Sequence, residues 1–122
     1  MLFNSRAEQV VYDELKSLGW NIQSEPRFHI PAGDRKIYIP DFALYDKDGD
    51  LFGIVEVLTN KHLCGFEKIE MLQRVARSSF APVMMITNGF AYDIYVNGKF
   101  ATQTNICPSM EVCQFLIRRL AA

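Results

Sequence analysis

The sequence has few features that would tie it to a membrane or to a secreted disulfide framework. Its three cysteines, Cys64, Cys107 and Cys113, are an odd number without a Cys-x-x-Cys pair, which favours a reducing compartment over disulfide bonds. No apolar run approaches the roughly 20 residues that span a bilayer, and the start MLFNSRAEQ lacks a charged segment followed by an apolar one. We therefore expect a soluble, cytoplasmic protein without a membrane partner.

A strong excess of charge of either sign is also absent. Thirteen Lys and Arg residues stand against fourteen Asp and Glu residues, so the formal net charge is -1. Any nucleic acid would have to be held by a local patch rather than by the field of the whole protein. Internal repeats, linkers, a Gly-rich phosphate loop and helicase motifs are missing from the 122 residues, which we expect to form one domain over residues 1–122.

What is present is an alternation of helix and strand patterns. Ser5 and Glu8 have capping-box spacing and open an expected helix over residues 6–18. Pro26 interrupts the following segment, which predicts an edge strand or a bent strand. Two strands around DKDGD, a helix over residues 66–79 and a strand in PVMMITNG come next. The expected apolar stripe of the first helix is Ala7, Val11, Leu15 and Leu18.

The remaining segments predict a hairpin around Asn97-Gly98 and a last helix that begins at Pro108-Ser109. Its expected apolar stripe is Cys113, Leu116, Ile117 and Leu120. The full order is α-β-β-β-α-β-β-β-α, which predicts an α/β (α+β) fold with a central mixed sheet flanked by helices.

Two carboxylates interrupt the apolar strands on either side of DKDGD. Asp48-Gly49 is a strong hairpin signal, and Asp41 and Glu56 lie equally far from it along the chain. They should face each other on neighbouring strands, with Cβ atoms about 5 Å apart. Their face should also carry Ile39, Ala43, Tyr45, Phe52, Ile54 and Leu58. The opposite face should carry Phe42, Leu44, Val55 and Val57, so both faces are apolar and the pair is expected to be central and buried.

Two like charges at that distance repel by roughly 3 kcal/mol at an effective dielectric constant of about 20. A divalent cation would relieve this repulsion, because converging carboxylates, backbone carbonyls and water are its ordinary ligands. A carboxylate pair at a wet sheet edge, or one that shares a proton, is the structural alternative. A separate metal site from His29, His62 and Cys64 has spacing that matches no zinc pattern.

The stretch IPDFALYDKDGDLFGIVEVL, with Pro40-Asp41 and Glu56-Val57, resembles the PD-(D/E)XK nuclease motif. Together with EKIEMLQRVAR and PVMMITNG, it resembles the N-terminal nuclease domain of type I restriction enzyme restriction subunits. The similarity runs from about Ser5 to Phe100. It implies a restriction-endonuclease-like fold and an endonuclease that uses Mg²⁺ or Mn²⁺ to hydrolyse nucleic-acid phosphodiesters.

The resemblance also implies roles for single residues. Asp41, Glu56 and the carbonyl of Val57 match the metal ligands, and Glu8 matches the acidic residue of the first helix that contacts the metal directly or through water. The capping box with Ser5 is the alternative for Glu8. Gln73 matches a helix glutamine near the active site, and a solvated helix position is its alternative.

The sequence departs from the family at one catalytic position. The family lysine belongs at position 58, and this chain has Leu58 there, which cannot stabilise developing negative charge. Lys61, Lys36 and Lys68 are the nearby replacements, and Lys61 and Lys36 have the wrong strand parity. Basic residues around the predicted site form an expected nucleic-acid rim of Arg35, Lys36, Lys61, His62, Lys68, Arg74 and Arg77.

Three functions remain open from the sequence. The first is a nuclease that acts on DNA, although the sequence leaves RNA open as a substrate. It would act alone, as a homodimer or with a larger restriction or helicase partner. The second is a catalytically degenerate nuclease fold that binds nucleic acid or protein. The third is a small-molecule or oligomerisation module in which the carboxylate pair is incidental.

Overall fold

The computed structural model describes residues 5–29, 37–58 and 66–121, and not the side chains of residues 66–68 and 121. Helix α1 (Arg6–Ser17) opens the fold. Ser5 is its N-cap, and the Ser5 Oγ accepts a hydrogen bond from the backbone N–H of Glu8 at 3.1 Å. The predicted capping spacing therefore sets the start of the helix, because this bond satisfies one of the unpaired N–H groups of the first turn.

The chain between the first and fourth strands forms a small second sheet beyond the main one. β1 (Asn21–Ser24) pairs with β4 (Phe42–Tyr45), and beyond them β2 (Phe28–His29) pairs with β3 (Ile37–Tyr38) as a separate two-stranded sheet. The break falls at Glu25, which has a φ of 51° and donates its N–H to the Asp41 carbonyl oxygen at 2.9 Å. The bent strand expected at Pro26 is confirmed.

The β4–β5 hairpin differs from the expected one at its loop. The N–H of Asp46 donates to the carbonyl oxygen of Asp50 at 2.9 Å, which leaves a three-residue loop with Gly49 at a φ of 84°. The register then shifts between Leu44 and Tyr45, and Phe52 becomes an extra residue on β5 (Leu51–Val57). This bulge restores the register that the sequence predicts.

Beyond the bulge, the hairpin has the expected pairing. Phe42 lies opposite Val55, and Ala43 lies opposite Ile54. Phe52 itself changes face, because the inserted residue reverses the alternation of side chains. It packs in the cluster of the opposite face, where its ring centroid lies 5.5 Å from that of Trp20. The expectation that Phe52 shares a face with Glu56 was therefore wrong.

The second half of the chain supplies the other helix layer and the far edge of the sheet. The elements in order are α2 (Phe66–Ser78), β6 (Val83–Thr87), β7 (Tyr92–Val96), β8 (Lys99–Thr104) and α3 (Met110–Ala121). Asn97 and Gly98 join β7 to β8 with φ values of 49° and 83°. Two positive φ values are typical of a type I′ turn, so the hairpin predicted there is confirmed.

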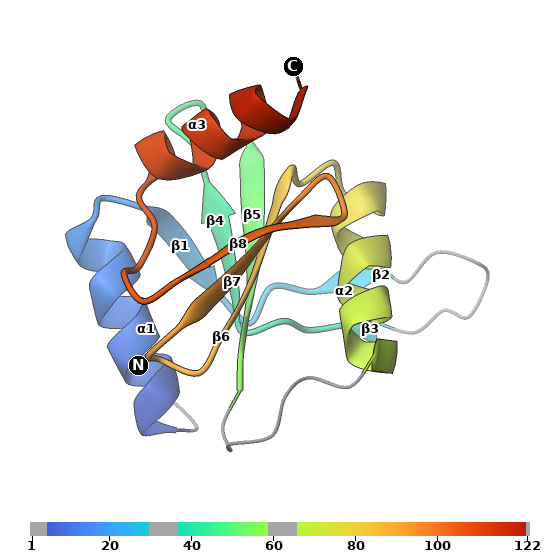
Figure 1. Ribbon diagram of the computed structural model, residues 1–122. Coiled ribbons are helices and arrows are strands. Elements are labelled where there is room, and N and C mark those ends of the chain that lie inside the picture. Colours follow the sequence, from blue (N-terminus) through green and yellow to red (C-terminus); the bar gives the residue numbers. More distant parts are fainter. Residues whose placement is uncertain (1–4, 30–36, 59–65, 122) are drawn as a thin grey trace.

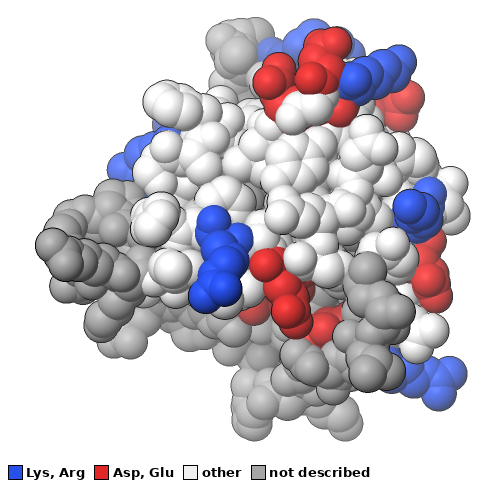
Figure 2. All heavy atoms as spheres, turned by 180° about the vertical axis from the view of Figure 1, so that it is seen from behind, with Lys and Arg blue, Asp and Glu red and all other residues white. Residues whose placement is uncertain are grey.

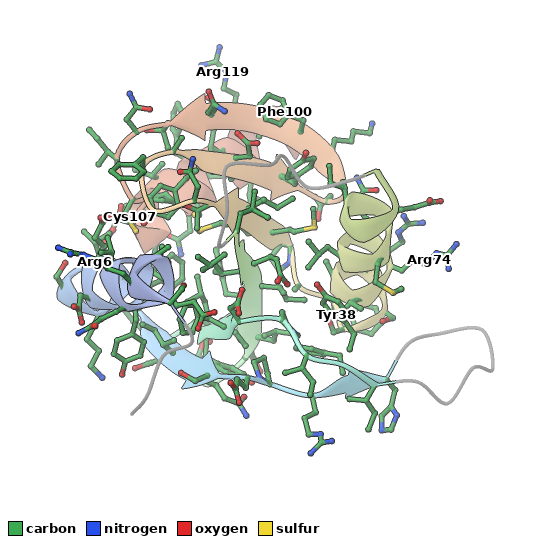
Figure 3. The ribbon with its side chains drawn as sticks, turned by 90° about the horizontal axis from the view of Figure 1, so that it is seen from below. Arg6, Tyr38, Arg74, Phe100, Cys107 and Arg119 are labelled. Carbon is green, nitrogen blue, oxygen red and sulfur yellow. The ribbon has the colours of Figure 1, made fainter. Side chains whose placement is uncertain are left out.

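The main sheet is mixed and central, as predicted. Its strand order is β1-β4-β5-β6-β7-β8, and only β5 and β6 run parallel. Helices α1 and α3 lie on one side of the sheet and α2 lies on the other (Figure 1). Seen from below, the β2–β3 sheet lies on the side of α2 (Figure 3).

Two apolar clusters hold these layers together. The larger joins α1 and α3 to the sheet through buried residues that include Val11, Leu15, Phe42 and Cys113. The smaller joins α2 to the opposite face through buried residues that include Ile54, Leu72, Val75 and Ile86. The expected alternation of Phe42, Leu44, Val55 and Val57 against Ile54 is confirmed by this division.

Three positions expected to be buried are open to solvent. Leu18, at the end of α1, is 43% exposed and Leu120, at the end of α3, is 52% exposed. Both lie at the C-terminal end of their helix. Ile39 is 46% exposed and lies between β3 and β4, outside both strands. Cys107 and Cys113 are buried free thiols, and Cys64 lies outside the described residues.

None of the described helices combines the length and the apolar character needed to cross a bilayer.

Candidate active site

Asp41 and Glu56 meet where the bent strand enters the main sheet. Asp41 directly precedes β4, and Glu56 is the residue after Val55, which pairs with Phe42. The backbone N–H of Val57 donates to Asp41 Oδ2 at 2.6 Å. Glu56 is only 7% exposed although it carries a carboxylate. Two acidic side chains therefore share a poorly solvated site on adjacent strands.

Pro40 explains why the side chain of Asp41, and not the backbone before β4, accepts the hydrogen bond from the Val57 N–H. The register that joins Phe42 to Val55 would place Asp41 opposite Glu56 and then Pro40 opposite Val57. Proline has no N–H to donate to the Val57 carbonyl oxygen, so the ladder ends at this pair. The N–H and the C=O of one strand residue point to the same side, so the Val57 carbonyl faces the side of Asp41.

Tyr38 is a site residue that the sequence did not predict. Its hydroxyl donates to Glu56 Oε2 at 2.6 Å, while its ring packs against the α2 cluster. Tyr38 has the opposite strand parity from Asp41, so regular alternation would place it on the other face. The chain is not in a strand over residues 39–41, between β3 and β4, and bends at Asp41, so the alternation of β4 does not extend to Tyr38. Tyr38 lies on β3 beside α2 in Figure 3.

The pKa of Asp41 is raised to about 7. Burial is the largest cause, and the charges of Glu56 and Glu8 and a hydrogen bond with Glu56 raise it further. The N–H of Val57 opposes them because it stabilises the ionised form. Asp41 thus keeps a proton at a pH where an exposed aspartate is ionised, and a cation would compete with that proton.

Glu8 approaches the pair from the first turn of α1. It is 7% exposed, and its charge acts on Asp41, while its backbone N–H makes the cap bond to Ser5. The bond from the Glu8 N–H to Ser5 is one half of the capping box, and the action of the Glu8 charge on Asp41 fits a role at the site. The oxygens of Glu8, Asp41 and Glu56 do not all fall within 4.8 Å of one another, which fits contact through water better than a direct third ligand.

Gln73 and Arg77 lie away from the carboxylates. Gln73 Nε2 donates to the Gly98 carbonyl oxygen at 2.7 Å, in the β7–β8 turn. That turn adjoins Pro82 at the start of β6, because the Asn97 N–H donates to the Pro82 carbonyl oxygen at 2.9 Å. Glu56 lies beside Ile86, toward the other end of β6. The side chain of Gln73 is thus engaged with the β7–β8 turn, and a role for it at the carboxylate pair stays a prediction.

Several predicted residues lie outside the described part of the chain. These are Arg35, Lys36, Lys61, His62 and the side chain of Lys68. Arg74 pairs with Glu70 at 4.0 Å on the surface of α2, and His29 is exposed on β2.

Leu58 occupies the position of the family lysine as an apolar side chain. It is half-buried against the α2 cluster, and its N–H donates to the Thr87 carbonyl oxygen at 2.7 Å. Thr87 ends β6 with its hydroxyl donated to the Ala91 carbonyl oxygen at 2.7 Å, so it is engaged in the β6–β7 loop. A cationic group at Leu58 would have to leave this apolar contact.

A second group of carboxylates lies in the β4–β5 loop. Oxygens of Asp46, Asp48 and Asp50 fall within 4.8 Å of one another, and Asp46 Oδ1 accepts the N–H groups of Asp48 and Asp50 at 2.9 and 3.0 Å. Acidic side chains gather at the end of the molecule where this loop lies (Figures 1 and 2). On the face in Figure 2 the described Lys and Arg side chains are scattered, without a continuous basic surface.

Comparison with solved structures supports the fold. Eight chains match, among them one in the cryo-electron-microscopy structure of a DrdV–DNA complex, with a TM-score of 0.57 and 15% sequence identity. The match covers 91% of this chain and 10% of the DrdV chain, so this chain spans about a tenth of that protein. At this identity the likeness concerns the fold alone. No family model and no curated protein sequence matches the chain.

Proposed function

We propose that this domain is a nuclease that hydrolyses DNA phosphodiesters with Mg²⁺ or Mn²⁺ at the Asp41–Glu56 pair. The observation that carries the proposal is the junction of these two carboxylates on adjacent strands, where burial and mutual repulsion raise the pKa of Asp41 to about 7. A purely structural sheet gains nothing from such a pair. A divalent cation would turn the repulsion into binding free energy.

The donor set suits a hard cation that prefers oxygen. Asp41, Glu56 and the carbonyl of Val57 would supply the oxygen ligands, and the charge of Glu8 on α1 also acts at this pair. No sulfur or imidazole ligand of the described residues is placed among them. Mg²⁺ accepts one or two carboxylates and keeps several waters, which agrees with a site made of two carboxylates and one carbonyl.

The side chains would divide the work of the reaction. A bound divalent ion supplies Lewis acidity to the phosphate and lowers the pKa of a bound water. The Val57 N–H holds Asp41 Oδ2, and the Tyr38 hydroxyl holds Glu56 Oε2, so both carboxylates keep one orientation. Glu8, whose charge acts on Asp41, would contact the ion directly or through water.

DNA is the proposed substrate because the related fold was solved in a complex with DNA. That fold forms about a tenth of the DrdV chain, so we also propose that this domain acts beside a larger restriction or helicase partner, or as a homodimer. The net charge of -1 implies that DNA affinity rests on local contacts.

Leu58 favours a second candidate, a nuclease fold that binds DNA without cutting it. Its side chain packs against the α2 cluster and adds no positive charge beside the phosphate. In that case the carboxylates would hold a structural cation, and Lys61, Lys36 or Lys68 would contribute nothing to catalysis.

Nicking of supercoiled DNA in Mn²⁺ separates the two candidates. Wild-type protein is compared with Asp41→Asn and Glu56→Gln, and Asp48→Asn in the exposed loop is the matched acidic control. The nuclease proposal predicts nicking by wild type and by the control, and none by the two site variants. Equal activity of wild type and Asp41→Asn would refute it, and DNA binding by wild type without nicking would favour the second candidate.

A further inference from the structure

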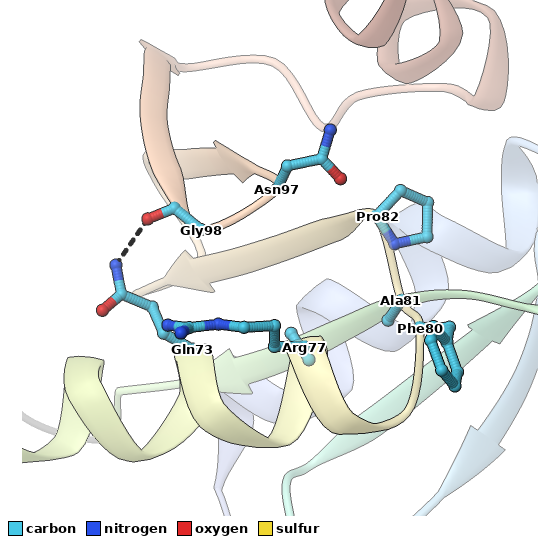
Figure 4. A pocket seen from close by; sticks show the side chains of 8 residues that line it. Gln73, Arg77, Phe80, Ala81, Pro82, Asn97 and Gly98 are labelled. Atoms are coloured by element: carbon cyan, nitrogen blue, oxygen red, sulfur yellow. Dashed lines mark hydrogen bonds between the residues drawn. The ribbon is translucent and has the colours of Figure 1, made fainter.

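A pocket of about 400 Å³ opens at the end of α2 that lies away from the carboxylates. Gln73 and Arg77 of α2 form one wall, Asn97 and Gly98 of the β7–β8 turn form the other, and Phe80 and Pro82 close one end (Figure 4). The hydrogen bond from Gln73 to Gly98 ties the two walls together at 2.7 Å. The pocket is therefore held open by the fold itself.

Phe80 has a conformation that packing does not explain. Helix α2 ends with the N–H of Ala81 bonded to the Ala76 carbonyl at 2.9 Å and the N–H of Phe80 bonded to the Arg77 carbonyl at 3.3 Å. This is a Schellman end, in which the residue at the position of Phe80 is left-handed and is usually glycine. Phe80 has a φ of 61° and is 88% exposed.

The backbone of Phe80 is thus strained at a position that glycine would fit better. Because the ring is exposed, its burial does not offset that strain. Exposed aromatic rings beside a pocket are typical of binding surfaces. The charge of the lining points to the chemistry of the ligand. Arg77 is its one charged residue, and it makes no ion pair with any described residue, whereas Arg74 on the same helix pairs with Glu70. A planar ligand that carries an anionic group fits this lining.

We propose that this pocket binds a nucleotide unit of single-stranded nucleic acid, with the base stacked on Phe80 and the phosphate held by Arg77. Asn97 and Gln73 offer amide groups to the edge of the base. The distance along β6 from Pro82 to Ile86, the residue beside Glu56, is about 13 Å, the span of a few nucleotides. A single strand of DNA bound at the carboxylate pair would therefore reach the pocket. In this respect the inference rests on the proposed function.

The test uses opposite effects on stability and binding. Affinity for a short fluorescent single-stranded DNA is measured by anisotropy in EDTA, so that cleavage does not intervene. Phe80→Gly should raise the melting temperature, because glycine relaxes the left-handed position, and should weaken DNA affinity on the order of tenfold, because one stacked base is lost. Phe80→Asn, which tolerates the same φ, should weaken binding as well.

Two further variants sharpen the result. Phe115→Ala removes an aromatic side chain of α3 that is 53% exposed and does not line the pocket, and this variant should bind like wild type. Arg77→Gln should weaken binding and lower the slope of log affinity against log salt by about one. Unchanged affinity of Phe80→Gly would overturn the proposal and leave Phe80 to a protein partner.

Competition distinguishes the two sources of a nucleotide. If a mononucleotide displaces the oligonucleotide only at far higher concentration, the ligand is a nucleic-acid strand, as proposed. Tight binding of the mononucleotide without binding of the oligonucleotide would overturn the proposal and identify a free nucleotide as the ligand. Two separate readouts keep this test apart from the nuclease proposal. The affinity of Phe80→Gly for the oligonucleotide in EDTA reports on the pocket, and nicking by Asp41→Asn in Mn²⁺ reports on the carboxylate pair, so failure of one proposal is distinguished from failure of the other.

Discussion

The backbone N–H of Val57 donates to Oδ2 of Asp41 at 2.6 Å, so a side chain continues the β4–β5 ladder where proline ends it. The bond fixes Asp41 beside Glu56 and partly offsets the cost of an ionised carboxylate there. A carboxylate that is held in place and yet keeps a proton to about pH 7 is suited to exchange that proton for a cation.

The raised pKa of Asp41 predicts how the metal-free protein responds to pH. Between 3.8 and about 7 the native state holds a proton that the unfolded chain has released. The free energy of unfolding should therefore fall as pH rises through this window, with no penalty below it. The loss should be roughly 2 kcal/mol after allowance for the solvent that reaches Asp41. Urea denaturation in EDTA across the window measures it.

Asp41→Asn isolates the contribution of this one group. Above pH 7 the variant should be as stable as wild type or more stable without metal, because an amide carries no charge beside Glu56. At low pH the advantage should vanish, since Asp41 is then protonated. Asp48→Asn in the exposed β4–β5 loop serves as the control. A variant that is equally destabilised at both pH values would show that Asp41 acts through packing alone.

Mn²⁺ should stabilise the fold and should bind more tightly as pH rises. The ion must displace the proton of Asp41, so its affinity should increase up to tenfold per pH unit below about pH 7 and level off above it. Calorimetric titration in two buffers of different ionisation enthalpy would also count the proton released. A melting temperature indifferent to millimolar Mn²⁺ at pH 8 would contradict a shared cation site.

Tyr38→Phe tests the positioning of Glu56. The variant removes the donor 2.6 Å from Glu56 Oε2 and keeps the ring that packs against the α2 cluster. Unfolding free energy should fall by about 1–2 kcal/mol, because a buried carboxylate loses a hydrogen bond. Mn²⁺ affinity should fall about tenfold, as expected for a group that orients a ligand. Tyr95→Phe, also beside this cluster, is the control and should leave Mn²⁺ affinity unchanged.

Leu58→Lys would restore the motif of the family that the sequence resembles. Leu58 packs against the α2 cluster, so the substitution should lower stability by about 1–3 kcal/mol unless the amine reaches the carboxylates. If the wild type lacks a catalytic cation, this variant should gain Mn²⁺-dependent nicking that Asp41→Asn then abolishes. Leu58→Met keeps the volume without the charge and should show no gain. An inactive Leu58→Lys that still binds Mn²⁺ would show that charge at this position is not what the site lacks.

Local patterns were sufficient to predict much of the fold. The capping spacing at Ser5 set the start of α1, and Asn97-Gly98 set the β7–β8 turn, because both signals act over a few residues. The pairing near Asp41 was predicted from Asp48-Gly49 although the turn itself differs. The loop has three residues, and a bulge at Phe52 restores the predicted pairing beyond it. The alternation of apolar and polar residues does not reveal such a bulge.

Long-range geometry set the parts of the site that sequence did not predict. Tyr38 reaches Glu56 from β3, which is separated from β4 by residues 39–41, so alternation along a single strand could not predict this contact. Gln73 donates to Gly98 because the β7–β8 turn comes close to α2, a contact between residues that are 25 positions apart in the chain. The pocket beside Phe80 depends on the same contact, and neither residue type nor spacing marks it in the sequence.

The most direct test of a shared cation site is anomalous diffraction from crystals grown at pH 8 with Mn²⁺. The proposal predicts an anomalous peak about 2.0–2.3 Å from carboxylate oxygens of both Asp41 and Glu56, with the Val57 carbonyl on the same ion. A peak that appears only at Asp46, Asp48 and Asp50, or no peak between Asp41 and Glu56 at saturating Mn²⁺, would contradict it.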